Sequence, residues 1–372
     1  MQRRTFLSLP AAGVLAADLK IPDLPSYRSV SSYKPAPKFG MPGPLAGRVV
    51  SVHAAKAVEG DTINTAVVRT MMDRGMCALT NAPHPIEAWR HFFEPQDVVG
   101  IKVNCSGAPN VCSRPEVVAE VVRNLNAVGV KPAQIWVYER FDEQVASVNY
   151  PRYLPEGVNV YVVETPRGSI RNYDPRTYVE VNFFGEDDTR SNLVRLVSER
   201  FTKIINVPNM KDHGAAGVTG CLKNIAYGNF SNVARSHQNE KTNTKTFIAT
   251  LASLEPLRSK TVLSVMDGLR GVWHGGPFVL DPKWVFYPKQ IKFGTDPVAM
   301  DRLLLDIIEA ERKKHGAVSV WERSMKYVHK DGPNDPNTNR FIREPGHIEY
   351  AAGLGLGVYD IKSIRHQEIE IA

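Results

Sequence analysis

The fold is decided by three consecutive segments, which read VVGIKVN at 98–104, SRPEVVAEVVRNLNAVG at 113–129 and IWVYE at 135–139. The first and third are short runs of β-branched and aromatic residues, which are typical of buried strands. The middle segment begins with a capping box, Ser113 to Glu116, and ends at Gly129, which predicts a helix over 117–128. A strand, a helix and a strand joined by short loops predict a crossover unit of a parallel sheet.

The same alternation continues on both sides of this unit. A helix is predicted over 61–75 with Asp61 as its cap. Further strands are predicted at 48–53, 158–163, 203–207 and 261–267. The predicted fold class is therefore α/β, with a mostly parallel sheet and helices on both of its faces. Segments 165–190 and 270–290 are rich in Gly, Pro and aromatic residues and predict loop or hairpin excursions, and 330–346 predicts an exposed loop.

Composition and charge exclude several classes of protein. The chain has 372 residues, of which 43% are hydrophobic, so it can bury a large core, and residues 47–372 are predicted to form a single α/β domain. Lys and Arg number 46 against 39 Asp and Glu, which gives a net charge of +7. The basic residues are scattered and form no dense run with interleaved aromatics, so no nucleic-acid partner is expected.

The first residues resemble an export signal. Arg3 and Arg4 precede the short apolar run LSLPAAGVLAA, which ends in small residues that a signal peptidase accepts. We therefore predict a twin-arginine signal peptide at 1–17, an extended linker or arm at 18–46, and a periplasmic or otherwise exported protein that meets the twin-arginine export machinery. The alternative is an amphipathic first helix. The apolar run is too short for a stable membrane anchor.

Four cysteines restrict the cofactors. They are Cys77, Cys105, Cys112 and Cys221, and no two of them form a C-x-x-C pair. The spacing therefore excludes a zinc ribbon and a ferredoxin-type iron–sulfur cluster. Cys105 and Cys112 flank a Gly/Pro/Asn loop, and the sequence leaves open whether they form a disulfide or remain two buried thiols.

Residues 206–224, NVPNMKDHGAAGVTGCLKN, carry most of the chemical signal. The pattern predicts a strand, a Gly-rich turn and a helix. Gly217 and Gly220 would let a ligand approach the backbone, and free amides at the helix start would bind an anion. Donor and cationic side chains gather in the same segment: Lys211, His213, Thr219, Lys223 and Asn224. The spacing matches neither a phosphate-binding loop nor a dinucleotide fingerprint, and the alternative is a structural turn with solvated lysines.

Other candidates follow the predicted strands. Lys102 lies inside an apolar strand and Asn104 ends it. Glu139 ends the next strand, and its alternative roles are a partner of Lys102, a general base, or an edge residue paired to Arg140. A divalent-metal site would have to assemble from residues far apart in the chain, namely His213, Asp296, His274 and His347. The alternative roles of Asp296 and His347 are a helix cap and a helix-terminus residue.

Several of these motifs resemble one known family, the domain of unknown function 362. They are the Lys-x-His-Gly at 211–214, TGCLKN at 219–224, GIKVN at 100–104, VYE at 137–139 and GTDPVAMD at 294–301. The resemblance implies the family's architecture, while the name of the family leaves its activity unassigned. Some members carry an appended ferredoxin-like cluster domain, and the cysteines for such a domain are missing here.

These observations predict an exported enzyme that acts on a small anionic or polyhydroxylated molecule in a crevice around the Gly-rich loop 208–220. His213 would transfer protons and Lys223 would hold the anionic group, with Lys102 and Glu139 across the crevice and, in one variant of this hypothesis, a metal ion. Further ligand contacts are predicted from Lys211, Gly217, Thr219, Gly220, Asn224 and Asn104. The alternatives are a periplasmic binding protein without turnover and a cofactor-delivery or maturation protein. The sequence indicates neither the reaction class nor the cofactor.

Overall fold

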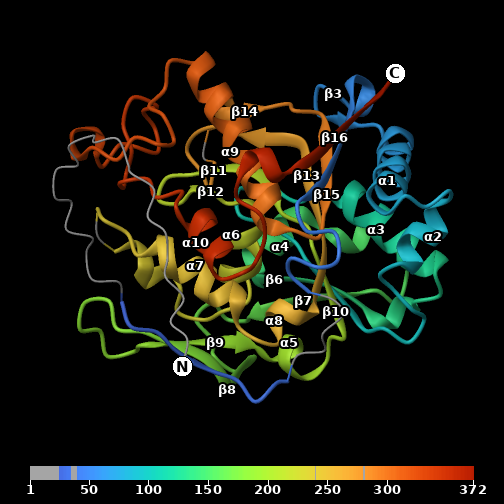
Figure 1. Ribbon diagram of the computed structural model, residues 1–372, viewed down its shortest axis with the longest axis horizontal. Helices are drawn as coiled ribbons and strands as arrows, with labels where there is room; N and C mark the ends of the chain where they lie inside the picture. Colours follow the sequence, from blue (N-terminus) through green and yellow to red (C-terminus); the bar gives the residue numbers. More distant parts are fainter. Residues whose placement is uncertain (1–24, 35–39, 239, 280) are drawn as a thin grey trace, which may run out of the picture.

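The structure is a computed structural model that describes residues 25–34, 40–238, 240–279 and 281–372. Within these residues the centre is an eleven-stranded sheet (Figure 1). Eight strands lie side by side in the order β16 (Arg365–Ile371), β2 (Arg48–Ala54), β15 (Gln290–Gly294), β13 (Thr261–Val272), β10 (Lys203–Asn206), β5 (Val99–Lys102), β6 (Ile135–Phe141) and β7 (Asn159–Glu164). The other three are β11 (Asn209–His213), β12 (Gly217–Val218) and β14 (Val285–Phe286). Within the row of eight, β15 is antiparallel to both of its neighbours and the remaining pairs are parallel, which confirms the predicted mostly parallel sheet.

Helices cover both faces of this sheet (Figure 1), as predicted. One face carries α1 (Thr65–Thr80), α2 (Pro85–Arg90), α3 (Pro115–Ala127) and α4 (Asp142–Val148). The other face carries α5 (Arg195–Glu199), α6 (Gly220–Tyr227), α7 (Thr244–Ser253), α8 (Leu257–Lys260), α9 (Pro297–Lys314) and α10 (His347–Gly353). Each layer buries its own apolar cluster against the strands, so the fold is α/β. No helix of the described residues is both long and apolar enough to cross a membrane.

Small sheets extend the body of the molecule. β1 (Arg28–Val30) pairs antiparallel with β8 (Tyr173–Glu180), which pairs with β9 (Arg190–Val194). The part of the predicted arm that the structure describes thus adds a strand to the excursion predicted at 165–190. β3 (Val58–Glu59) and β4 (Thr62–Ile63) form a separate two-stranded ribbon. The predicted signal peptide at 1–17 lies outside the described residues.

Two helix starts differ from the prediction. Helix α1 begins at Thr65 because Asp61 belongs to the turn of the β3–β4 ribbon, and the cap is Asn64, whose side chain accepts from the amide of Val67. Helix α3 begins at Pro115 without a side-chain cap. The Ser113 hydroxyl instead accepts from the amide of Asn104 and donates to the carbonyl of Val207. These two bonds connect the loop after β5 to the end of β10.

The segment after β10 is also more ordered than a Gly-rich turn. It forms β11, which runs parallel to β13 and pairs antiparallel with the short strand β12, and α6 follows. The prediction missed this hairpin because the strands are too short to show an alternating pattern.

The order of the strands locates the ligand crevice. The chain runs outward from β5 through β6 to β7 and then returns to place β10 on the opposite side of β5. Ligands of parallel α/β sheets bind at such a reversal, outside the carboxyl ends of the strands. Here that point lies between the ends of β5 and β10, where the polar residues after each strand converge.

Candidate functional site

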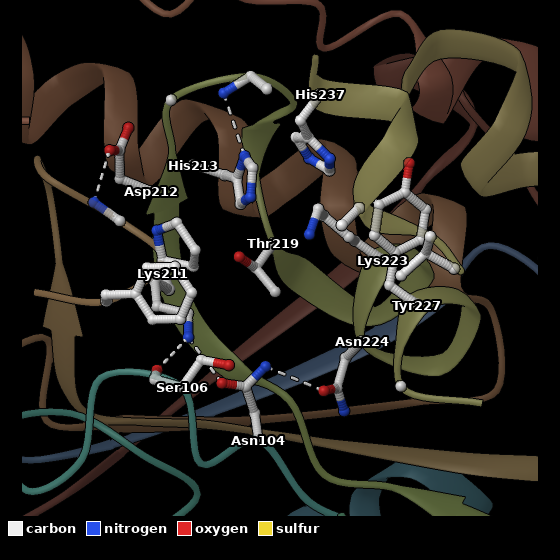
Figure 2. A pocket seen from close by; sticks show the side chains of 18 of the residues that line it. Asn104, Ser106, Lys211, Asp212, His213, Thr219, Lys223, Asn224, Tyr227 and His237 are labelled. Carbon is white, nitrogen blue, oxygen red and sulfur yellow. Dashed lines mark hydrogen bonds between the residues drawn. The ribbon is translucent and has the colours of Figure 1, made fainter. Parts of the chain in front are cut away.

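A cavity of about 540 Å³ opens at this reversal. Its wall comes from the ends of β5 and β6, from β11 and α6, and from two loops at 274–278 and 332–343 (Figure 2). The structure brings nine of the predicted site residues to this wall: Lys102, Asn104, Glu139, Lys211, His213, Thr219, Lys223, Asn224 and His274. Residues from β5, β6, β11 and α6 therefore share one space, although more than one hundred positions separate the first from the last.

The cavity wall carries a large excess of positive charge. Seven Lys and Arg side chains line it, against the carboxylates of Glu139 and Asp212. Four of the seven form ion pairs, namely Lys102 with Glu139, Arg140 with Glu164, Arg167 with Glu143 and Arg343 with Asp212. Lys211, Lys223 and Arg340 have no acidic partner among the described residues. Such a wall attracts anions.

A chain of hydrogen-bonded amide side chains forms the floor of the cavity (Figure 2). Lys211 Nζ donates to Asn104 Oδ1 at 2.6 Å and to the Ser106 carbonyl at 2.5 Å. The Asn104 amide then donates to Asn224 Oδ1 at 3.0 Å, and the Asn224 amide donates to Asn206 Oδ1 at 2.8 Å. Each amide thus has a fixed orientation, because its oxygen and its nitrogen have different partners.

Lys102 and Glu139 form a hydrogen-bonded ion pair. Lys102 Nζ donates to Glu139 Oε1 at 2.8 Å and to the Val103 carbonyl at 2.5 Å. The Glu139 carboxylate also accepts from the backbone amides of Arg140 and Cys105. Both side chains are buried. Of the three roles considered for Glu139, this geometry favours the partner of Lys102, since its oxygens are already bound and the Arg140 side chain pairs with Glu164.

The His213 ring is a hydrogen-bond donor. Its Nδ1 accepts from the amides of Ala215 at 3.1 Å and Ala216 at 3.2 Å, so the proton of the neutral ring is on Nε2. Burial and the nearby Lys223 cation hold the pKa of His213 well below its usual range. The ring therefore offers a neutral N–H, and this pattern does not support the predicted proton transfer by His213.

A second histidine, His237, was not predicted. The rings of His213 and His237 lie 5.4 Å apart between centroids (Figure 2). The Ser236 hydroxyl donates to the Val233 carbonyl, so its oxygen is left to accept from His237 Nδ1, 3.0 Å away. His237 Nε2 then carries a lone pair, and it has no partner in the described part of the chain. Burial and Lys223 lower the pKa of His237 to about 3. Its sequence surroundings contain no motif that marks it.

Two side chains of the α6 region face the cavity without partners. Thr219 Oγ1 is buried and makes no hydrogen bond with a described residue. Lys223 Nζ likewise has no acceptor there and lies 4.3 Å from the centre of the Tyr227 ring. Burial, together with Lys211 and Arg140, lowers the pKa of Lys223 to about 7. The predicted common face of Thr219 and Lys223 is thus the face that lines the cavity.

The predicted anion site at the start of α6 is wrong, because a carboxylate of the protein already occupies it. Asp301 accepts from the amides of Cys221 at 2.5 Å and Leu222 at 2.9 Å. Gly220 has a φ of +54° and packs against this carboxylate, where a Cβ would overlap it. Gly217 has a φ of +74° in the β11–β12 turn. Neither glycine lines the cavity, so both are structural.

The four candidate metal ligands do not converge. Asp296 caps α9 and accepts from the amides of Gly47, Val358 and Ala299, away from the cavity. His347 is buried at the start of α10 and does not line the cavity. His274 does line it, but its Nδ1 lies 3.1 Å from Arg312 Nη1. Among the residues that the structure describes, no group of three or more His, Cys, Asp or Glu side chains is placed to hold a metal ion.

Two further expectations have clear outcomes. Cys105 and Cys112 are both buried free thiols, and Cys105 contacts the hydroxyl of Tyr150.

The loop predicted to be exposed at 330–346 instead closes one side of the cavity, and its Arg343 is buried and bound to Asp212. The sequence did not reveal this role because a Pro- and Asn-rich loop looks the same whether it is solvated or folded back onto a site.

Comparison with known proteins places the chain in a family. The sequence profile of the domain of unknown function (DUF362) matches residues 99–306. No curated protein matches the chain. A crystal structure of a protein from Thermotoga maritima is similar with a TM-score of 0.34 and 12% identity, over 58% of this chain and 52% of that one, so the chain spans about half the length of that protein. Since the matched segment holds more than half of the chain, the protein belongs to the domain of unknown function 362 family.

Proposed function

We propose that the protein is an exported enzyme that acts on a small anionic molecule held in the cavity. The observation that carries this proposal is the set of basic side chains in the wall, where Lys211, Lys223 and the exposed Arg340 form no ion pair within the described residues. Burial lowers the pKa of Lys211 and of Lys223 to about 7, and a bound anion would restore the charged form of both. A buried cation without a counter-ion is unfavourable unless a ligand supplies the missing charge. A neutral polyhydroxylated ligand would leave this charge uncompensated.

Donors and one acceptor around the same space support an enzyme rather than a simple binding protein. Lys211 uses two of its three N–H groups on the floor and has a third for a ligand. His213 Nε2 offers an N–H, and His237 Nε2 offers a lone pair. A donor and an acceptor side by side are the groups that polarise an oxygen and remove a proton. An anion bound nearby would raise the pKa of His237 from its low value.

The test is a binding screen by calorimetry and thermal shift. We expect inorganic phosphate and small carboxylates to bind and to raise the melting temperature, whereas neutral polyols have little effect. The variants Lys211→Met and Arg340→Gln should each weaken anion binding roughly tenfold, because each removes one charge-assisted contact. Binding should also weaken as ionic strength increases.

The matched control is Lys56→Met, since Lys56 is exposed and does not line this cavity. This variant should bind anions like the wild type. Equal loss of binding in Lys56→Met, or polyols that bind as tightly as anions, would contradict the proposal. A ligand that is recovered unchanged after prolonged incubation with the wild type would favour the binding or delivery protein instead of the enzyme.

Export rests on the Arg3–Arg4 pair and the short apolar run that follows it. The expected outcome is a periplasmic protein that loses its first residues during transport. Cell fractionation measures this directly, and replacement of both arginines by lysine should retain the protein in the cytoplasm. A protein whose location is unaffected by that replacement would not use the twin-arginine route.

A further inference from the structure

Three lysines line the cavity, and only one of them has an amine without a hydrogen-bond acceptor in the described part of the chain. Lys102 is bound to Glu139, and Lys211 is bound to Asn104 and to the Ser106 carbonyl. Lys223 Nζ has no hydrogen-bond acceptor among the described residues, although its side chain is buried. Figure 2 shows Lys223 reaching from α6 toward the space between Thr219 and His213. An amine in this position is available to a ligand.

The surroundings of Lys223 favour its neutral form. It packs on the Tyr227 ring, is buried, and is close to the cations of Lys211 and Arg140. These effects bring its pKa to about 7, so about half of the amine has a lone pair at neutral pH. Neighbouring cations and an apolar pocket are the conditions under which lysine becomes a nucleophile toward carbonyl groups.

Groups that handle protons lie around the same amine. Among the described residues, neither the lone pair of His237 Nε2 nor Thr219 Oγ1 has a partner. His213 presents an N–H on the opposite side of the space, as its Nδ1 is bound to the backbone (Figure 2). An acceptor and a donor beside an amine are the groups that addition to a carbonyl requires.

Building on the proposed function, we infer that Lys223 forms a Schiff base with an anionic aldehyde or ketone. The Nζ lone pair attacks the carbonyl carbon, and a C–N bond forms. His237 takes the proton that the nitrogen releases and returns it to the carbonyl oxygen, which the His213 N–H polarises, so a carbinolamine forms. A proton from solvent then lets the hydroxyl leave as water, and the iminium remains. No oxidant or reductant is consumed in this step.

The test traps the imine with sodium cyanoborohydride in the presence of pyruvate or glyoxylate, followed by peptide mass spectrometry of the full chain. We expect a reduced adduct at Lys223, formed at least ~tenfold faster than at the exposed Lys56. Lys211 should remain unmodified because its amine is bound to Asn104 and Ser106. The variant Lys223→Met should lose the adduct, while Lys56→Met should keep it at Lys223.

Lactate and glycolate are matched anions that lack the carbonyl. They should compete with adduct formation and leave no adduct themselves. Binding of all four anions without an adduct at Lys223 would overturn the Schiff base and leave the proposed anion site intact, whereas absence of any anion binding would contradict the proposed function itself. Labelling with trinitrobenzenesulfonate across the neutral range is a probe that needs no carbonyl ligand. Reactivity of Lys223 no greater than that of Lys56 would also overturn the inference.

Discussion

The start of α9 and the cavity both bury charged side chains, and the two regions differ in whether these side chains have hydrogen-bond partners. At the start of α9, Asp296 and Asp301 are fully buried, and each accepts hydrogen bonds from two or more backbone amides. In the cavity, Thr219 Oγ1 is buried without a partner among the described residues, and the amine of the buried Lys223 has no hydrogen-bond acceptor there. Burial of a polar group is therefore not by itself a sign of function.

The difference has an energetic meaning. A buried polar group that is hydrogen-bonded contributes to stability, and one that is not bonded destabilises the fold by roughly 1–3 kcal/mol. The region at α9 thus ties this helix to the start of α6 and to the backbone of Gly47 and Val358, while the cavity contains polar groups that lower the stability of the fold unless a ligand binds them. Mutations in the first region should reduce stability, and mutations in the second should reduce binding while stability is kept or increased.

The largest loss of stability is expected for Asp212→Asn. Asp212 lines the cavity, but its carboxylate, unlike the Lys223 amine, already has ion-pair partners. Its carboxylate lies 2.5 Å from Arg343 Nη1 and 3.6 Å from Arg312 Nη1, and all three side chains are buried. Loss of the negative charge leaves two buried guanidinium groups, so the free energy of unfolding should fall by about 3–5 kcal/mol. Urea unfolding measures this loss. The control is Glu143→Gln, because Glu143 forms an exposed ion pair with Arg167, and its free energy of unfolding should change by less than ~0.5 kcal/mol.

The second effect is expected for Asp301→Ala. This change removes the acceptor of the Cys221 and Leu222 amides at the start of α6, and we expect a loss of about 2–4 kcal/mol. Asp306→Ala on the same helix is the control, since Asp306 is half exposed and pairs with Arg302 at the surface. If Asp301→Ala kept its stability and lost only ligand binding, Asp301 would belong with the cavity groups and the comparison would fail.

The third prediction is a gain, not a loss, in the free energy of unfolding. Lys223→Met replaces the amine of a buried side chain, which has no hydrogen-bond acceptor within the described residues, by an apolar chain of similar length. The free energy of unfolding at pH 7 should increase on the order of 2 kcal/mol. Thermal and urea unfolding both measure it, with Lys56→Met as the exposed control. A clear loss of stability in Lys223→Met would show that the amine has a structural partner.

The gain from Lys223→Met should depend on pH. The pKa of Lys223 is lowered from 10.5 to about 7 in the folded protein, so the unfolded chain binds an extra proton between these values. The wild type therefore gains stability as pH rises from about 7 toward 10.5, and the advantage of the variant should vanish by about pH 10. The groups that face Lys223 are Lys211, His213, Arg140, His237, His347, Arg343 and Tyr227. The Lys223 cation lowers the pKa of His213, His237 and His347, so the difference is measured above pH 7, where these rings are neutral in both proteins. An advantage that stays constant with pH would contradict the lowered pKa.

The smallest effect on stability is expected for Thr219→Val. The hydroxyl Oγ1 makes no hydrogen bond with the described residues, so its replacement by a methyl group should change the free energy of unfolding by less than ~0.5 kcal/mol or raise it slightly. Anion affinity should still fall several-fold, as measured by calorimetry. Thr250→Val in α7 is the matched control, because Thr250 donates to the Thr246 carbonyl away from the cavity. Unchanged affinity in Thr219→Val would remove the hydroxyl from the ligand site.

The sequence predicted six strands of the central sheet, β2, β5, β6, β7, β10 and β13, because short apolar runs are visible locally. It did not predict β11, β12, β14, β15 and β16. It also selected Lys211 and Lys223, which line the cavity, through their place in the segment after β10. It failed at the start of α6, since the partner of those amides is Asp301, about 80 positions away. His237 and Arg343 were missed for the same reason, as neither has a local pattern that marks its position.

The sequence alone determined the α/β class and the family, because both depend on periodicity and on motifs that are contiguous in the chain. It also determined which residue types would be available at the carboxyl ends of the strands. Only the tertiary structure decided which of these are satisfied. Hydrogen-bond partners are set by the packing of distant segments, so Asp301 became a helix cap while Lys223 kept a free amine in the cavity.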